Sequence, residues 1–237
     1  MNILGLYKKE IKSYFNSPIA YLVVLFFVLF CNVYFLFFNQ FIARNVASLR
    51  GFFALIPLVF IILIPSITMR SWAEEKKVGT EELLLTLPLT NWELVLGKFL
   101  SSLTLLAIML GMTLFVPITL STLGHFERGQ IIGEYLGAFL LGAAALSIGQ
   151  FISSITSNQI SAYIFGVVGL LFITLIGEVA VLLNPAGALS RIFTHLSFTF
   201  HFGSFKKGLV DTRGLLYFLL IIFYFLYLNV KVINLRK

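Results

Sequence analysis

The sequence has 237 residues, of which 59% are hydrophobic and only 11% are charged, and its mean hydropathy is +0.99. Soluble domains carry about 25% charged residues, so this composition excludes an ordinary water-soluble protein and indicates an integral membrane protein. The net charge of +7 is typical of basic residues that flank membrane spans, and the sequence has no basic stripe that would predict nucleic-acid binding. The single cysteine, Cys31, excludes an intramolecular disulfide and a cysteine-based metal cluster.

Residues 1–17 are predicted to form an amphipathic helix. Apolar residues recur at helical spacing, and Lys8, Lys9 and Lys12 lie between them. This pattern is typical of a helix in the membrane interface, with its lysines against anionic lipid headgroups. The apolar run that follows is too long for the core of a signal peptide, and no small-residue cleavage site closes it. We therefore expect this segment to be retained.

Six apolar segments follow, each long enough to cross a bilayer as a helix of about 20 residues. The fourth is rich in small residues, including Gly133 and Gly137, which predicts close packing against other helices. The predicted fold is an all-α integral membrane protein with one transmembrane domain over residues 1–237. The expected spans are residues 19–38, 52–69, 99–120, 133–155, 160–183 and 215–232.

With six spans, both termini share one side of the membrane with the polar loop at residues 70–98. That side carries ten of the 17 lysine and arginine residues, and the other side carries seven. Because lysine and arginine favour the cytoplasmic side, both termini are predicted to be cytoplasmic, in a bacterial cytoplasmic (inner) membrane.

The loop at residues 70–98 carries a local helix signal. Gly79 is expected to break the helix that leaves the second span, and Thr80 to cap a new short helix. Glu81 and Glu82 then occupy its first turn, where the helix dipole favours negative charge. Pro88 is expected to end it.

A second start signal follows, because Thr90 and Glu93 form a capping box for the helix that enters the third span. The short helix before it, from about Glu81 to Leu87, combines carboxylates with a run of leucines. Carboxylates suit an anionic membrane surface poorly, so a protein partner is the better candidate to cover it. The leucines are Leu83, Leu84, Leu85 and Leu87.

At this loop the sequence resembles the type-2 (ABC-2) permease family. The pattern is an acidic-basic run, Gly-Thr, paired glutamates, a leucine run, a proline, and then Gly-Lys opening the next span. Residues 201–218 resemble the segment before the last span of permeases associated with gliding motility and with nitrous-oxide gene clusters. The matching loop residues are Glu74, Glu75, Gly79, Thr80, Glu81, Glu82, Leu84, Pro88, Gly97 and Lys98.

The resemblance implies a coupling helix that docks on a separate ABC ATPase subunit. It also implies an elbow helix with Lys8, Lys9 and Lys12 at residues 1–17, and short re-entrant helices on the outer face within residues 184–214. The implied docking residues are Gly79, Thr80, Glu81, Glu82, Leu83, Leu84, Leu85, Leu87 and Pro88.

The partners implied are two copies of the ATPase, a second permease chain, identical or homologous, an outer-side accessory subunit and membrane lipid. The sequence has no Gly-x-x-x-x-Gly-Lys-Ser/Thr loop, so ATP and magnesium are expected on the partner and no cofactor in this chain. The direction implied by the family is export.

Few other ionisable residues lie near the membrane. Glu178 is expected inside the fifth span, where a role in the pathway or its gate competes with an interfacial or helix-paired carboxylate. His125, His195 and His201 are expected on the outer side. With Glu178, the last two form the one candidate metal set, but solvated histidines explain them and no metal is expected.

Two other functions stay open from the sequence. An intramembrane enzyme, such as a membrane protease, needs a nucleophile and base or metal ligands that face each other at membrane depth. The pair Glu81 and Glu82 is superficially similar to a glutamate protease motif, but the arginine of that motif is absent. A structural anchor of a larger assembly needs only packing and a docking loop. The apolar spans favour a lipidic, amphiphilic or polypeptide substrate over a small ion.

Overall fold

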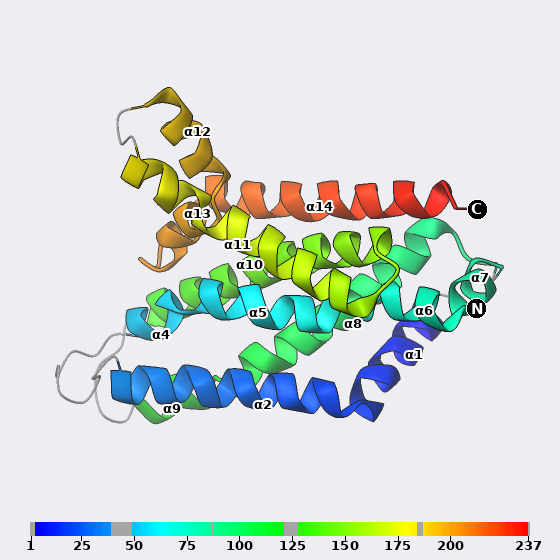
Figure 1. Cartoon of the computed structure of the whole chain (residues 1–237). Helices are drawn as coiled ribbons and strands as arrows, with labels where there is room; N and C mark the ends of the chain where they lie inside the picture. The colour runs from blue at the N-terminus through cyan, green and yellow to red at the C-terminus, as the bar shows by residue number, and fades with distance from the viewer. Residues whose placement is uncertain (1–2, 39–48, 87, 121–127, 184–186, 237) are drawn as a thin grey trace.

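The computed structural model describes residues 3–38, 49–86, 88–120, 128–183 and 187–236, and these residues form an all-helical bundle (Figure 1). The predicted all-α class is confirmed, since no strand occurs among the described residues. The helices are α1 (Ile3–Asn16), α2 (Pro18–Val33), the π-helix η1 (Tyr34–Phe38), α4 (Arg50–Ala54), α5 (Ile56–Thr68), α6 (Ala73–Val78), α7 (Thr80–Leu85), α8 (Asn91–Met112), α9 (Phe115–Leu120), α10 (Arg128–Ile155), α11 (Gln159–Leu183), α12 (Ala188–Leu196), α13 (Phe198–Phe205) and α14 (Thr212–Asn234).

Five helical segments among the described residues are long and apolar enough to cross a membrane, and the number is six if the bent pair α1 and α2 counts as one span. Both termini lie at the same end of the bundle as α6 and α7, and α12 and α13 lie at the other end (Figure 1). This arrangement is that of an even number of crossings. We call the first the α7 end and the second the α12–α13 end.

The third predicted span starts earlier in the structure than expected. Its helix, α8, begins at Asn91 rather than at Phe99, because Thr90 and Glu93 form the predicted capping box. It ends at Met112, and α9 follows after a break, so the candidate span Asn91–Thr119 ends close to the predicted residue 120. Pro117 in α9 has no backbone N–H to donate to the carbonyl one turn earlier, which accounts for a break at this place.

The small residues of α10 allow the close packing that the sequence predicts. A Cβ atom at Gly137 would lie 2.5 Å from Phe205 Cβ, and one at Gly149 would lie 2.3 Å from Thr68 Oγ1. At Gly142 the nearest side chain is Leu106, at 2.6 Å. The helix α10 therefore contacts α13, α5 and α8 at distances that only glycine permits, and it forms the centre of the bundle.

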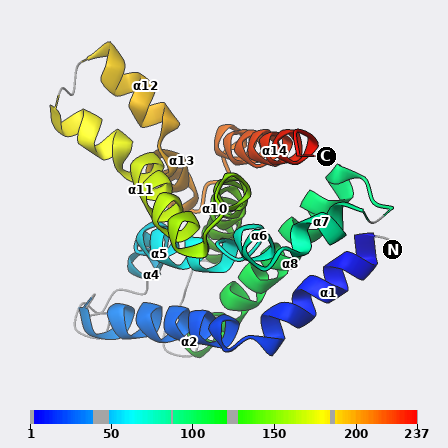
Figure 2. The ribbon, with the colours of Figure 1, turned by 45° about the vertical axis from the view of Figure 1, so that its right-hand side comes forward.

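The amphipathic helix α1 meets α2 at an angle of 73°. Ser17 caps α2 by accepting a hydrogen bond from the Ile19 backbone N–H at 3.4 Å, and Pro18 takes the first helical position, where a missing N–H costs nothing. Beside α8, Leu6 of α1 is fully buried and lies over Gly97. The helix α1 lies alongside α8 in both views (Figures 1 and 2).

Candidate partner-docking site

The loop between α5 and α8 folds as two short helices joined by a glycine. Gly79 ends α6 with a left-handed φ of 77°, which L side chains rarely adopt. The prediction that Thr80 caps α7 is wrong, since Gly79 holds the N-cap position. The Thr80 hydroxyl instead donates to the Glu75 carbonyl at 3.4 Å. The short helix is α7, and it ends at Leu85, before Pro88 is reached.

A buried lysine ties this loop to two other helices. Lys98 of α8 is 2% exposed, and its Nζ lies 2.8 Å from Glu75 Oε1 on α6 and 3.1 Å from Glu10 Oε1 on α1. The same Nζ lies 4.9 Å from the centre of the Trp72 ring. A buried charge is tolerated only when it is paired and hydrogen-bonded, so the positions of α1, α6 and α8 depend on one another.

Hydrogen bonds join the loop to the end of α10. The Lys76 ammonium donates to the carbonyls of Ser154 and Thr156, the latter at 2.9 Å. The Ser153 hydroxyl oxygen accepts from the backbone N–H groups of Trp72 and Ala73, each at 3.1 Å. Since α10 is the central helix, these contacts connect the loop directly to the core.

The C-terminal helix joins the same assembly. Arg236, just after α14, lies 3.0 Å from Glu81 of α7, and the side chain of Asn234 accepts a hydrogen bond from that of Asn91. On the other flank, Arg70 pairs with Glu74 at 3.7 Å and donates to Ser17 at 2.7 Å. Residues from α1, α8, α10 and α14 therefore hold the loop on several sides.

One edge of the loop stays exposed. Lys77, Val78, Gly79, Thr80 and Glu82 are exposed, and Val78 retains 67% of its surface. We call these five residues the α6–α7 edge. Their row of apolar, backbone and carboxylate groups offers a partner both hydrophobic contact and hydrogen bonds.

The expectation that Leu84 faces a partner is wrong, because this side chain is only 4% exposed within the chain itself. The α7 helix turns Leu84 into the bundle, while Pro88 remains exposed. The side chains of Leu83 and Leu85, and all of Leu87, lie outside the described residues.

At the α12–α13 end, the candidate metal set does not converge. No group of three metal-ligating side chains occurs in the part of the chain that the structure describes. His201 Nε2 lies 2.9 Å from the His195 carbonyl oxygen, and its ring stacks on Tyr217 with 3.9 Å between centroids. Glu178 is exposed on α11, and His125 lies outside the described residues.

A buried carboxylate that the sequence analysis did not single out lies on α10. Glu134 is fully buried, and its Oε1 accepts a hydrogen bond from Gln130 at 2.9 Å. Burial lowers the pKa of Lys206, and the carboxylates of Glu178 and Glu134 oppose that shift. Lys206 therefore lies within the electrostatic reach of both acids. The sequence does contain a signal for this buried carboxylate, because Glu134 is a single acidic residue that follows Gly133 in a glycine-rich apolar run.

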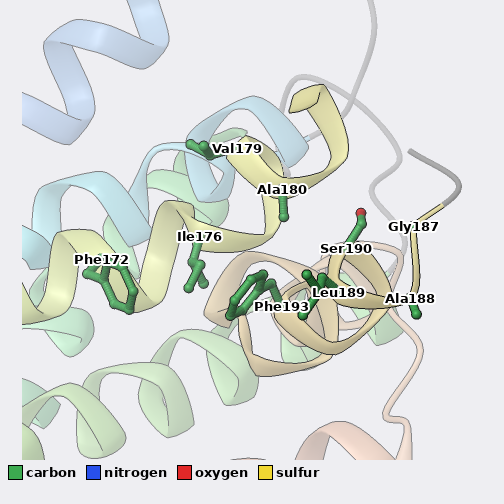
Figure 3. A pocket seen from close by; sticks show the side chains of 9 residues that line it. All are labelled: Phe172, Ile176, Val179, Ala180, Gly187, Ala188, Leu189, Ser190 and Phe193. Carbon is green, nitrogen blue, oxygen red and sulfur yellow. The ribbon is translucent and has the colours of Figure 1, made fainter. Parts of the chain in front are cut away.

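An apolar pocket of about 570 Å³ lies between α11 and α12 at this same end (Figure 3). Phe172 and Ile176 line it from α11, and Leu189 and Phe193 line it from α12. Ser190 contributes the hydroxyl. This lining contains no acid, base or metal ligand, so the pocket can hold a hydrocarbon group but offers no base that would activate the Ser190 hydroxyl.

Comparison with protein families agrees with the loop pattern. The family model described as ABC-2 family transporter protein matches residues 4–223, which include all the spans in the bundle up to α14 and the whole loop between α5 and α8. No curated protein matches the chain. Members of this family are the membrane-spanning parts of ABC transporters and not the ATPases. The match covers most of the chain, so this all-helical membrane protein belongs to the ABC-2 transporter family.

Proposed function

We propose that this chain is the permease subunit of an ABC exporter and that its ATPase subunit docks on the α6–α7 edge. One observation carries the proposal: the loop is held by Lys98, Lys76 and Arg236 from inside the chain, while Val78 and Glu82 remain exposed. Because the loop is bonded to several helices, a displacement of the loop by a partner would move those helices as well. The exposed α6–α7 edge is the part of the loop that the ATPase subunit would contact.

The same contacts supply a route for the motion. Closure of two ATPase subunits around ATP and magnesium would displace α6 and α7 together. Lys76 and Ser153 would carry the displacement to α10, and Lys98 would carry it to α1 and α8. Alternating access needs two alternative packings of the helix bundle, and a partner that shifts the equilibrium between them. The central helix α10 contacts most of the helices that would have to repack.

The finer assignments rest on resemblance. Two ATPase copies, a second permease chain, identical or homologous, and an outer-side accessory subunit are proposed from the family pattern. So are a bacterial cytoplasmic membrane and cytoplasmic termini, with α12 and α13 as the re-entrant helices of the outer face. Residues 201–218 support the gliding-motility and nitrous-oxide-cluster branch. Glu178 stays a proposed pathway or gate residue, because an ionisable side chain within a membrane span is costly and is kept mainly for function.

The test is co-purification in mild detergent with identification of bound P-loop ATPases and measurement of ATP hydrolysis. Glu82→Lys reverses an exposed charge on the edge and is expected to release the ATPase or abolish its stimulation by the permease. Lys207→Glu, an exposed charge reversal at the α12–α13 end, is the control and is expected to retain both. Absence of any P-loop ATPase from the wild-type complex would refute the proposal and favour the enzyme or anchor alternatives.

A further inference from the structure

An apolar groove of about 390 Å³ lies between α1 and α8. It is lined on α1 by Leu4 and Tyr7, and on α8 by Leu100, Leu103, Thr104 and Ala107. The hydroxyls of Tyr7 and Thr104 lie 2.9 Å apart and hydrogen-bond each other, so the groove presents mainly hydrocarbon. From Leu100 to Ala107 it follows α8 for about 10 Å at 1.5 Å per residue.

The exposed charged side chains of α1 beside this groove are positively charged. The one acid of α1, Glu10, is bound to the buried Lys98, and Lys9 lies 4.0 Å from Glu75. Lys8 and Lys12 are exposed, and neither has an ion-pair partner among the described residues. Lys8 stands one helical turn after Leu4, and Lys12 one turn further, so both cations share a helix face with a groove-lining residue.

We propose that this groove binds one anionic phospholipid of the leaflet at the α7 end of the bundle. An acyl chain lies along α8 between Leu100 and Ala107, and the phosphate lies beside Lys8 and Lys12. Charge complementarity selects this occupant, because an uncharged lipid or an apolar helix would leave both lysines without a counter-ion. The bound lipid would restrain α1, which the Glu10–Lys98 ion pair joins to α8 and, through Glu75, to the loop between α5 and α8.

The test is native mass spectrometry of the purified full chain, titrated with phosphatidylglycerol and phosphatidylcholine of identical acyl chains. Phosphatidylglycerol is expected to bind more tightly, by about fivefold for each lysine beside it. The double variant Lys8→Gln, Lys12→Gln is expected to lower its affinity to that of phosphatidylcholine. Ala107→Trp, which fills the groove from an exposed position, is expected to weaken both lipids.

Two matched variants serve as controls. Lys207→Gln removes an exposed lysine at the α12–α13 end, and Leu220→Trp enlarges a side chain that is 67% exposed on α14. Both are expected to bind lipid as the wild type does. Equal affinity for the two lipids, or an unchanged preference in the double lysine variant, would overturn the proposal. Because the readout is lipid binding alone, failure here would leave ATPase docking untouched.

Discussion

The ammonium of Lys98 lies 2.8 Å from the carboxylate of Glu75, although Lys98 is only 2% exposed. The two residues belong to different helices, α8 and α6, and Glu10 of α1 completes the group at 3.1 Å. A lysine between two carboxylates leaves a small net charge to bury, whereas either carboxylate without it would be an unpaired charge in a closed site. This group of three charged side chains therefore connects the helix bundle to the loop between α5 and α8.

Replacing Lys98 by Met is expected to destabilise the protein by about 3–5 kcal/mol, the cost of breaking a buried ion pair from one side. Thermal unfolding in detergent measures it. The triple variant Lys98→Met, Glu10→Gln, Glu75→Gln should recover much of the loss, since it removes the unpaired charges. Lys77→Met, at an exposed lysine of α6, is the control. Equal stability of Lys98→Met and Lys77→Met would contradict the role of the buried group.

Ser153 holds two backbone N–H groups of the loop. Ser153→Ala leaves the buried amides of Trp72 and Ala73 without this acceptor, at a cost of about 1–3 kcal/mol. Hydrogen exchange of these amides should accelerate. Ser102→Ala removes an equally buried hydroxyl that donates only to its own helix, at Phe99, and should change little. Unchanged exchange in Ser153→Ala would mean that the Ser153 hydroxyl is not needed to hold these two amides.

The packing of α10 against α13 should tolerate no side chain at Gly137. In Gly137→Ala the new Cβ would lie 2.5 Å from Phe205 Cβ and 2.7 Å from its Cγ, so one helix must move. Overpacking of this kind costs about 1–3 kcal/mol. Gly111→Ala in α8 is the matched control, because a Cβ there meets nothing within 4 Å. The melting temperatures of the two variants are compared with that of the wild type. A smaller decrease in melting temperature for Gly137→Ala than for Gly111→Ala would be incompatible with this packing.

Acid should weaken the α12–α13 end through His201. Burial lowers the pKa of this imidazole below its ordinary value, and the hydrogen bond to the His195 carbonyl only partly opposes the shift. As pH falls through about 6.5 the unfolded chain takes up the proton first. Stability should therefore decrease on acidification between the unfolded-state pKa and the lower folded-state pKa.

His201→Gln is expected to flatten that decline, since glutamine does not titrate. Thermal unfolding measured from pH 8 to about pH 5 in the wild type and the variant makes the comparison over the range in which histidine titrates. An identical slope in both proteins would assign the pH dependence to another group.

Several features follow from local sequence patterns. The apolar segments become helices of the bundle, the Thr90 and Glu93 capping box starts α8, and Gly79 ends α6. Each depends on residues within a few positions of one another, where hydrophobicity, dipole and backbone freedom act directly. The ABC-2 loop pattern belongs to this class, and so does the amphipathic helix α1.

The tertiary structure alone decided which of these residues meet. Glu10 and Lys98 are 88 positions apart in the chain, and no local pattern pairs them. It also turned Leu84 into the bundle, and it buried Glu134. The physical reason is that burial and charge pairing depend on which helices pack together. That packing is set by close contacts between distant residues, such as Gly149 against Thr68 and Gly97 against Leu6.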